Sequence, residues 1–534
     1  MKRLIFILAL TANFILVLAV MSNSLDPDFG WHLSFGRDWA QTGQFPYTDT
    51  YTWSKPDMPY TNHEWGGSAL LWFIYSRFGY TPLLFIAAST VLAGFLIIQK
   101  TFFKKITTVG LVFSFIALWC VTHILIMRLA MVTLFFMALT LYILEKIDTG
   151  EDKYIWFLAP LFWLWSCVHG SWVLGFIIIN IYFFASLAQK IAPLKLRPYL
   201  LGKIWNNKIF YKLIATQAVA VGLIAINPYG LKIFVEISEY FQQGYYKNFI
   251  GEWVPSYNFP IFWEILILQT VGLALLARAY WAKQVTIRQG LIYLAFFYSA
   301  WSYKRNALLI APLTVPILAA TAEYAWSKLK KIPLFSPSKI LKLPMVYFLI
   351  ALLALNFFYI LRFHNSTDIW NDPELLSAHD LPLDAANFLN ARLQNEKPKI
   401  FNDFNWGGFM IYKMPGVPIY FDGRGTATWM YNTSTSMLAH YHAIFRDPDG
   451  LAEIENNDVK YIFLEKHTYF SIGPPDRVNK FLFGSRLNRV YNTEPRELEK
   501  DLENNQNWQL IYSNTSTNIW QNVNPALTPP PRQI

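Results

Sequence analysis

The sequence predicts an α-helical polytopic membrane protein with about eleven transmembrane helices and a small extracytoplasmic α/β domain at its C-terminal end. Composition is the first observation: of 534 residues, 54% are hydrophobic and 15% are charged, whereas soluble proteins carry roughly 25% charged residues. The second observation is a series of apolar runs of the ~20 residues that cross the hydrocarbon core of a bilayer. The third is a change after residue 361, where polar and apolar residues mix and no further run of that length follows.

Eleven apolar runs are candidate transmembrane helices. The fifth and the ninth are short for a span, so the count could differ by one. The first run resembles a signal peptide, but no small-residue cleavage site precedes Asp26, so we expect it to be retained as a helix. The stretch at residues 65–79 is shorter and is expected to lie at the membrane interface. The eleven runs are residues 4–23, 80–99, 106–125, 127–145, 154–169, 171–189, 209–226, 262–279, 289–303, 306–326 and 343–361.

The basic residues predict the orientation of these helices. The net charge of +10 would also fit nucleic-acid binding, but the Lys and Arg residues form short clusters between apolar runs. When eleven spans are threaded, every cluster falls on one side, which the positive-inside rule makes cytoplasmic. We therefore expect a multi-pass protein of the cell membrane with no nucleic-acid partner, and residues 362–534 outside the cytoplasm. Cys120 and Cys167 lie inside apolar runs and indicate neither a disulfide framework nor a metal site.

The first outer loop, residues 24–79, holds a dense set of ionisable residues beside the membrane. A proline follows Asp26 and restricts it to extended geometry, in which residues two apart point the same way, so Asp26 and Asp28 can face one ligand. If Asp28 caps a following helix, His32 lies one turn above it. Such a helix suits the bilayer surface, because its aromatic stripe is Trp31, Phe35 and Trp39. The plainer interpretation makes Asp28 an N-cap and Asp26 a turn residue.

Threading brings further ionisable residues to the same face as that loop. Charged groups at membrane depth are costly and are normally retained for pairing or function, so their convergence favours an active site that opens outward. A snorkelling or helix-pairing role stays open for single members such as His123 and Arg128. The residues expected at this face are Asp26, Asp28, His32, His63, Glu64, His123, Arg128, His169, Asn227, Glu252, Lys304 and Arg305.

Residues 362–534 are expected to form a small α/β domain with a disordered tail from about residue 525. Asp403, Asp422 and Arg424 follow predicted strands, where turn chemistry is the favoured interpretation and acceptor binding is the alternative. Sequons begin at Asn365, Asn432 and Asn514. The predicted elements are a helix at 384–393, strands at 399–404 and 417–424, a helix at about 430–446, a further helix before a strand at 459–465, and a closing hairpin at 508–520.

Five short motifs together carry a resemblance to a known superfamily. They are AspProAspPheGlyTrpHisLeu at 26–33, AsnHisGluTrp at 62–65, ValHisGlySerTrp at 168–172, AsnProTyrGly at 227–230 and AspGlyArg at 422–424. The chain resembles the GT-C superfamily of membrane glycosyltransferases, in particular a bacterial group similar to the protein O-mannosyltransferases and aminoarabinose transferases. It lacks the TrpTrpAspTyrGly-type signature of oligosaccharyltransferases and the repeat-containing outer insert of eukaryotic protein mannosyltransferases.

The resemblance implies an enzyme that transfers a hexose or pentose, with inversion, from a polyprenyl-phosphate donor to an extracytoplasmic glycan, lipid or protein. The catalytic acid of the superfamily matches Asp28 or Asp26; we assign the base role to Asp28 and make Glu64 the second candidate. Binding of acceptor or phosphate is assigned to His32, His63, Arg128, His169 and Arg305.

Some members of the superfamily use a divalent metal, and Asp26 with Asp28 could ligate Mg²⁺ or Mn²⁺. Other members work without a metal, so the cofactor is left open. Two competing functions also remain: a transporter or flippase of a lipid-linked precursor, and a catalytically silent membrane scaffold. A transporter would place its ionisable residues near the bilayer midplane on broken helices, so convergence at one face favours the enzyme.

Overall fold

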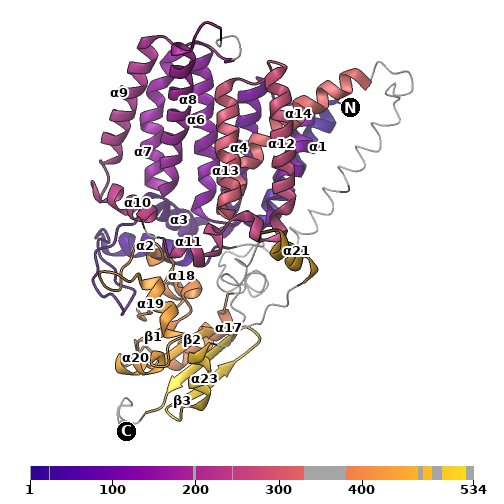
Figure 1. Cartoon of the computed structure of the whole chain (residues 1–534). Coiled ribbons are helices and arrows are strands. Elements are labelled where there is room, and N and C mark those ends of the chain that lie inside the picture. The colour runs from indigo at the N-terminus through magenta and orange to yellow at the C-terminus, as the bar shows by residue number, and fades with distance from the viewer. Residues whose placement is uncertain are drawn as a thin grey trace.

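A helical bundle and a small mixed domain make up the computed structural model, with a layer of crosswise helices between them (Figure 1). The structure describes residues 2–22, 25–195, 200–242, 244–329, 351, 381–466, 473–483 and 496–524. The eleventh expected span at 343–361, the domain boundary at residue 361, the sequon at Asn365 and the tail from residue 525 lie outside these ranges.

The bundle helices coincide with the first ten apolar runs. In lipid, the backbone N–H and C=O groups of a span must form hydrogen bonds within that span, so these runs fold as helices. Within the part of the chain that the structure describes, six segments are long and apolar enough to cross a membrane: Lys2–Ser22, Tyr80–Phe103, Leu129–Asp148, Gly170–Ile191, Pro260–Trp281 and Lys304–Lys328. The chain is thus a multi-pass membrane protein. The bundle helices are α1 Lys2–Ser22, α4 Tyr80–Phe103, α5 Thr108–Trp119, α6 Val132–Asp148, α7 Leu158–Val168, α8 Val173–Ile191, α9 Asn207–Ile224, α12 Trp263–Trp281, α13 Ile287–Ser302 and α14 Ala307–Leu329.

Short helices cross one end of the bundle, where it meets the C-terminal domain (Figure 1). Two of them, α2 Phe29–Thr42 and α3 Trp65–Phe78, are the segments expected at the membrane interface, and they pack against each other. Two more, α10 Lys232–Gln242 and α11 Tyr246–Phe249, come from the connection between α9 and α12. This layer therefore assembles residues that are far apart in the sequence at one end of the bundle.

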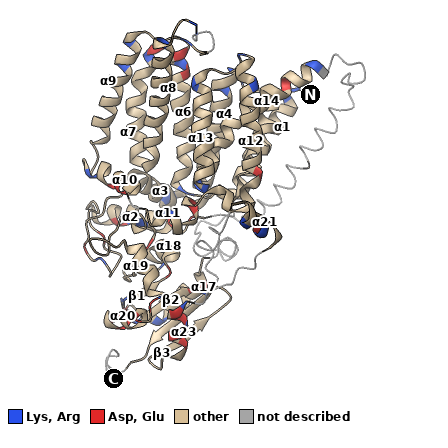
Figure 2. Ribbon diagram, in the orientation of Figure 1, with Lys and Arg blue, Asp and Glu red and all other residues tan. Residues whose placement is uncertain are grey.

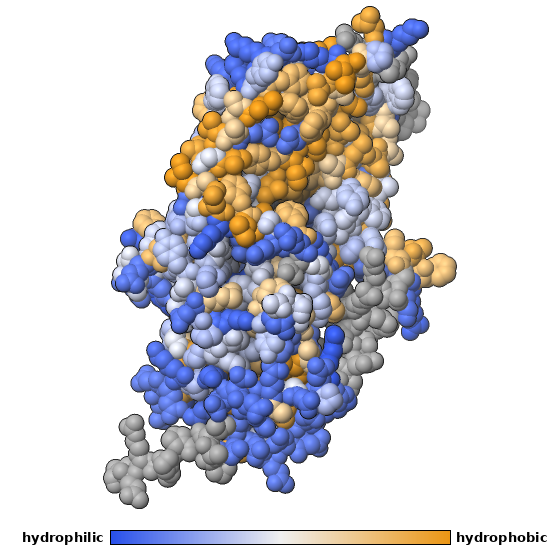
Figure 3. Space-filling model, turned by 60° about the vertical axis from the view of Figure 1, so that its left-hand side comes forward, coloured by the Kyte–Doolittle hydropathy of each residue, from blue (hydrophilic) through white to orange (hydrophobic). Residues whose placement is uncertain are grey.

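Charge and hydropathy are segregated along the molecule. Figure 2 shows Lys and Arg gathered at the end of the bundle opposite the C-terminal domain. Figure 3 shows an apolar belt across the visible face of the bundle, above a largely polar domain. Arg288 lies between two of the apolar runs, among the basic residues that predict orientation, but it is fully buried at the start of α13. Its guanidinium pairs with Asp148 and donates to Ser186 Oγ at 2.7 Å, so Arg288 joins three helices at this end.

The C-terminal domain contains one four-stranded sheet in the order β1-β2-β4-β3 among its described residues. β1 and β2 are parallel, and the expected hairpin is the antiparallel pair β3 and β4. The segment at 417–424 was predicted to be a strand, but only Ile419 makes isolated bridges. The elements are α17 Leu383–Leu393, β1 Ile400–Asn402, α18 Gly407–Lys413, α19 Met437–Ile444, α20 Gly450–Asn456, β2 Tyr461–Glu465, α21 Pro474–Phe483, α23 Glu497–Asn504, β3 Trp508–Ser513 and β4 Thr517–Asn522.

The expected helix at 430–446 begins later, at Met437 in α19. The side chain of Asn432 accepts hydrogen bonds from the backbone N–H groups of Ser434 and Thr435. This turn uses the backbone donors that a helix would need, so the helix starts beyond it.

The domain is fixed to the first loop by direct contact between backbones. α18 packs against α2, and a Cβ atom at Gly30 would overlap the carbonyl oxygen of Gly408 and lie 2.8 Å from its carbonyl carbon. The indole of Trp53 donates to the carbonyl oxygen of Ile400 at 2.9 Å. Residues of the domain therefore reach the loop that carries Asp26 and Asp28.

Candidate active site

A cavity of about 590 Å³ lies where the bundle, the crosswise helices and the C-terminal domain meet. All eight residues that the sequence analysis assigned to catalysis or substrate binding line it. They come from the first loop, from the loops before α6 and α8, and from the turn before α14. The eight residues are Asp26, Asp28, His32, His63, Glu64, Arg128, His169 and Arg305.

The two aspartates of the first loop have different surroundings. Asp26 Oδ1 accepts the backbone N–H of Asp28 at 3.0 Å, and Oδ2 lies 3.1 Å from Arg128 Nε. Asp28 occupies the N-cap position of α2 without a side-chain capping hydrogen bond. Its carboxylate has no hydrogen-bond or ion-pair partner among the described residues, although it faces the cavity. Asp26 is therefore held in place and Asp28 is available to a ligand.

Burial raises the pKa of Asp28 well above its usual value, and the nearby carboxylates of Asp26 and Asp422 raise it further. Burial also raises the pKa of Asp26, but Arg128 opposes this effect. A carboxylate with a raised pKa is a stronger base than a free one. The pKa shifts and the hydrogen bonds thus both favour Asp28 over Asp26 as the base.

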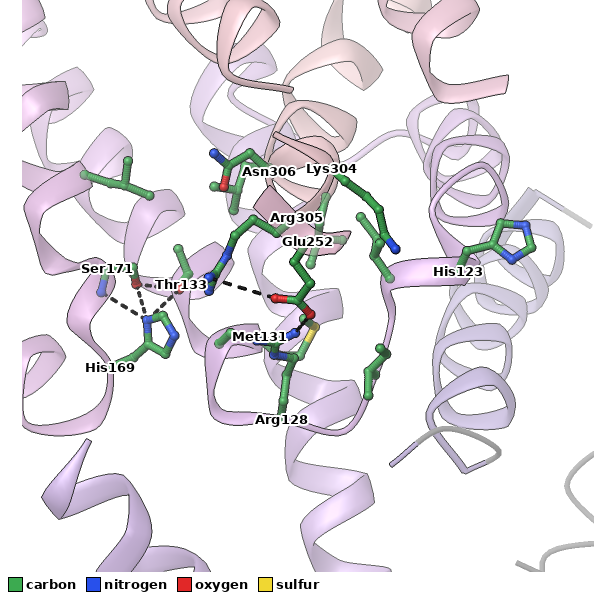
Figure 4. A pocket seen from close by; sticks show the side chains of 16 residues that line it. His123, Arg128, Met131, Thr133, His169, Ser171, Glu252, Lys304, Arg305 and Asn306 are labelled. Carbon is green, nitrogen blue, oxygen red and sulfur yellow. Dashed lines mark hydrogen bonds and ion pairs between the residues drawn. The ribbon is translucent and has the colours of Figure 1, made fainter. Parts of the chain in front are cut away.

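Cationic side chains surround one carboxylate at the bundle end of the cavity. Figure 4 shows Glu252 between the guanidinium groups of Arg128 and Arg305. Glu252 pairs with Arg128, and its Oε2 lies 3.9 Å from Arg305 Nη1. Although burial raises the pKa of Glu252, the two arginines lower it to about 2. Lys304 has no carboxylate within ion-pairing distance among the described residues, and its ammonium lies 4.8 Å from the centre of the Phe259 ring. The cluster therefore carries a net positive charge.

A smaller cavity of about 90 Å³ continues from this cluster into the bundle. It shares Arg128, Glu252, Lys304 and Arg305 with the larger one, and His123 also lines it. Its remaining walls are largely apolar and include Ile124, Ile126, Met131, Leu174, Leu308 and Leu309. The cations are therefore shared by both cavities, and aliphatic side chains of the bundle line the smaller one beside them.

Glu64 is surrounded by three histidines. Its Oε1 lies 3.1 Å from His169 Nε2 and 3.9 Å from His63 Nε2, and its Oε2 lies 3.2 Å from His32 Nε2. Burial raises the pKa of Glu64 to about 8 and lowers that of His63 to about 4. It also lowers the pKa of His32 well below its usual value. At neutral pH the cluster is therefore uncharged.

The hydrogen bonds around this cluster fix where its protons lie. The hydroxyl of Ser68 donates to the carbonyl oxygen of Glu64, so His32 Nδ1 donates to Ser68 Oγ and its Nε2 carries a lone pair. Protonated Glu64 donates from Oε2 to this nitrogen. His169 Nδ1 accepts the backbone N–H of Ser171, so its Nε2 donates to Glu64 Oε1. One proton on Glu64 thus satisfies both contacts.

The C-terminal domain completes the wall beside Asp28. A Cβ atom at Gly423 would overlap Asp28 Oδ1 and lie 2.8 Å from its Cγ. The next residue, Arg424, is buried, donates to both Asp422 oxygens and lies 2.8 Å from Asp49 Oδ1. The turn that the sequence predicted at Asp422 is present, because Asp422 accepts the backbone N–H of Arg424. The same turn also places Gly423 against the candidate base.

Several lining residues were not among the candidates from the sequence. Glu252 and Lys304 were placed at this face but were given no role, and Arg424 was assigned to a turn. Glu236 and Tyr240 lie on α10 and line the cavity; Thr428 donates to Glu236 Oε1 at 3.2 Å. α10 is an amphipathic helix rather than a span, so threading gave no signal for it. Its charged and aromatic residues at four-residue spacing were the available signal.

The expected metal site at Asp26 and Asp28 does not match the arrangement of these residues. Both Asp26 oxygens are already engaged, and Arg128 lies beside one of them. Hard divalent cations require six or more oxygen ligands from carboxylates, carbonyls or water. Among the described residues, no group of three or more His, Cys, Asp and Glu side chains is arranged to hold a metal ion. We therefore assign no step to a metal.

The chain combines a multi-span bundle, crosswise first-loop helices and a C-terminal domain over the cavity. This architecture can be compared with that of known membrane proteins. No protein-family model and no curated protein sequence matches the chain. Among solved structures, the chain is similar to the Archaeoglobus fulgidus oligosaccharyltransferase in the apo form, at 12% identity and a TM-score of 0.52, over 86% of this chain and 69% of that one. It is also similar to ArnT from Cupriavidus metallidurans bound to undecaprenyl phosphate, at 12% identity and a TM-score of 0.50, over 98% of this chain and 99% of that one.

Both of these proteins are GT-C superfamily membrane glycosyltransferases. The resemblance that the sequence motifs indicated is therefore confirmed at the level of the fold. The match to ArnT spans nearly the whole of both chains, so the shared fold includes the C-terminal domain as well as the bundle.

Proposed function

We propose that this chain is a membrane glycosyltransferase that moves a sugar, with inversion, from a polyprenyl-phosphate-linked donor to a hydroxyl of an extracytoplasmic acceptor. The observation that carries the proposal is the unpartnered carboxylate of Asp28 in a cavity that Arg128, Lys304 and Arg305 also line. A base and a set of cations that line one cavity are what a transfer from a phosphate leaving group requires.

The cation cluster suits the phosphate of a lipid carrier. Arginine binds phosphate oxygens with two parallel N–H donors, and lysine adds a point charge. Arg305 has only a distant ion pair, at 3.9 Å, and Lys304 has none among the described residues, so both can turn toward a ligand. The adjoining apolar cavity offers a path for the prenyl chain. The solved ArnT structure contains undecaprenyl phosphate, which is consistent with this kind of donor.

In the proposed reaction, Asp28 takes the proton of the acceptor hydroxyl. The acceptor oxygen then attacks the anomeric carbon from the side opposite the phosphate. The bond between that carbon and the phosphate oxygen breaks, and polyprenyl phosphate leaves with the electron pair. Arg305, Lys304 and Arg128 stabilise the charge that develops on the phosphate. Asp26 is a positioning residue, because it holds Arg128 and the backbone of Asp28.

The distribution of charge supports an extracytoplasmic site. The basic residues gather at the end of the bundle opposite the C-terminal domain (Figure 2), and the positive-inside rule makes that end cytoplasmic. The cavity and the C-terminal domain would then lie on the outer side, where a lipid-linked sugar and an acceptor could meet.

A transporter of the same lipid is less consistent with this geometry. Transporters bind substrate near the bilayer midplane between broken helices. Here the cavity lies at one end of the bundle and the C-terminal domain forms one of its walls. A silent scaffold gives no reason for a buried carboxylate without a partner, which is costly to keep.

The proposal is tested by sugar transfer with the purified full-length chain in lipid nanodiscs. Polyprenyl-phosphate hexose and pentose donors are supplied with a cell-envelope extract, and release of polyprenyl phosphate is measured. We expect release by the wild type with one of the donors and its loss in Asp28→Asn. Absence of release with every donor, or full activity of Asp28→Asn, would show the proposal to be wrong.

A further inference from the structure

The ten-residue helix α21, Pro474–Phe483, carries its apolar side chains outward. Val478, Phe481 and Leu482 are 47%, 88% and 58% exposed, and their spacing places them on one helical face. The polar residue Asn479 is buried instead, and its Nδ2 donates to the carbonyl oxygen of Asn258 at 2.6 Å. A surface helix in water has the reverse pattern, so this face calls for an apolar partner.

The position of α21 indicates which partner this is. The helix packs on the short turns Ser256–Asn258 and Pro260–Phe262, and the second turn is the start of the membrane span Pro260–Trp281. The ring of Phe483 lies 4.8 Å from that of Tyr257. In Figure 1, α21 lies next to the lower end of α12, at the level where the apolar belt of Figure 3 gives way to polar surface. Its outward face is therefore at the edge of the lipid-facing surface.

Two basic residues accompany the apolar face. Arg477 and Lys480 are both exposed, one turn apart on α21. Lipid headgroups carry phosphates, and basic side chains beside an apolar stripe are typical of helices that lie in the interface between headgroups and acyl chains. The charge of this surface is thus complementary to a membrane surface.

We propose that α21 is an interfacial anchor, which inserts Val478, Phe481 and Leu482 into the lipid and places Arg477 and Lys480 among the phosphates. The anchor is independent of the proposed enzymatic function. It gives the C-terminal domain an attachment to the bilayer besides its contacts with the first loop, and so fixes the distance of the domain from the membrane.

The test uses the full-length chain with one copy in each nanodisc of phosphatidylethanolamine and phosphatidylglycerol. Cys120 and Cys167 are replaced by alanine, and a fluorophore is attached at Phe481→Cys. Matched labels are placed at Ile267→Cys, on the exposed surface of the α12 span, and at Lys500→Cys, on α23. We expect nitroxide-labelled lipids to lower emission about two-fold or more at positions 481 and 267 but not at 500, because an interfacial helix buries its apolar face ~5–10 Å deep.

Three outcomes would overturn the proposal. Quenching of position 481 by aqueous iodide as strongly as position 500 would place this face in water. Shielding from both iodide and nitroxide lipid would mean that another part of the chain covers it. Shielding that appears only when two copies share a disc would make a second copy its partner.

A second set of variants checks that the apolar side chains are responsible. With the label at Val478→Cys, the double substitution Phe481→Ser and Leu482→Ser should abolish quenching by nitroxide lipid. The conservative change Phe481→Leu, made with the same label, should keep it. Equal quenching in both variants would contradict the anchor.

Discussion

Asp26 and Asp28 are two positions apart and line the same cavity, but their hydrogen bonds assign them different tasks. Asp28 has no partner among the described residues, whereas Asp26 holds Arg128 and a backbone N–H. We therefore expect Asp28→Asn to lower kcat by about 10²-fold or more, which is the typical contribution of a general base. Asp26→Asn keeps the oxygen that accepts the backbone N–H and is expected to lose less activity. Both variants are compared by initial rates at saturating donor. A larger loss in Asp26→Asn than in Asp28→Asn would reverse the assignment.

Gly423 tests the position of that carboxylate without changing its chemistry. A methyl group at this position would overlap Asp28 Oδ1, and the aspartate side chain is the part that can move. In Gly423→Ala we expect an unchanged fold and a kcat lowered by about tenfold or more, because small misplacements of a reacting group are costly. KM for the donor should change little, because the three atoms nearest the added methyl group all belong to Asp28 and none to the cations. A change confined to KM, or a loss of thermal stability, would contradict this positioning role.

The raised pKa of Glu64 predicts that the stability of the folded chain depends on pH. Its pKa is raised to about 8 in the folded chain, so above pH 4.5 the folded state binds a proton that the unfolded state has lost. The contribution of Glu64 to the free energy of unfolding is fully present below the pKa of this group in the unfolded chain, and it is lost as the pH rises through 8. Between pH 7 and 9 the loss is on the order of 1 kcal/mol.

The matched variant is Glu64→Gln, whose amide remains neutral at every pH and can donate to His32 Nε2 while its oxygen accepts from His169. We expect the melting temperature of the wild type to fall more steeply between pH 7 and 9 than that of Glu64→Gln. The three histidines are present in both proteins, so their contribution to the pH dependence cancels in the comparison. Thermal unfolding in detergent at constant ionic strength measures the difference. Parallel curves would show that Glu64 is ionised at neutral pH.

The candidate residues could be predicted from the sequence because most of them lie in loops or at helix ends that the threading places on one side of the membrane. His169 and Arg305 follow or precede apolar runs whose order alone fixes the side. Which of them pair could not be predicted, since the contact between Arg128 and Glu252 joins loops that are 124 residues apart. Nor could the partner of Asp26 be predicted, because a DxD triplet contains no information about the loop opposite it.

Among the elements, the contact between α2 and α18 controls how the domain meets the first loop. Gly30 and Gly408 face each other so closely that a Cβ atom at Gly30 would lie 2.8 Å from the carbonyl carbon of Gly408. Backbone cannot yield as a side chain can, so Gly30→Ala must separate the two helices. We expect a melting temperature lowered by several degrees, for a cost of about 1–3 kcal/mol, together with a loss of activity.

Gly222→Ala is the matched control, because nothing lies within 4 Å of its added methyl group. It changes a helical glycine in the same way but at a site without a close neighbour. Its melting temperature and activity should equal those of the wild type. Equal melting temperatures for Gly30→Ala and Gly222→Ala would mean that α2 and α18 are not in contact.

Element prediction succeeded where one physical requirement dominates. An apolar run of about 20 residues has few alternatives to a helix in lipid, and so the first ten runs are helices. In the C-terminal domain, β1, β2 and the final hairpin were also predicted. The strand predicted at 417–424 was wrong, because Ile419 makes only single bridges there, to Thr52 and to Ile400. α21 was missed, because its apolar residues face outward.

At the scale of the whole molecule, the orientation of the chain in the membrane decides the compartment into which the cavity opens. The basic end of the bundle, opposite the C-terminal domain (Figure 2), predicts that the domain is outside the cytoplasm. Single cysteines at Lys105 and Lys500, both exposed, report the two ends in a background where Cys120 and Cys167 are alanine. In intact spheroplasts, a membrane-impermeant maleimide should label Lys500→Cys at once and Lys105→Cys only after permeabilisation.

The reverse labelling pattern would place the cavity in the cytoplasm. The basic clusters would then face outward, against the positive-inside rule, and a donor flipped to the outer leaflet could not reach Arg305 and Lys304. The base role of Asp28 and the positioning role of Gly423 would survive this result, since they depend on contacts within the chain. The proposed acceptor would not, because it would have to be a cytoplasmic molecule. Labelling of the two cysteines thus separates the chemistry of the site from the compartment in which it acts.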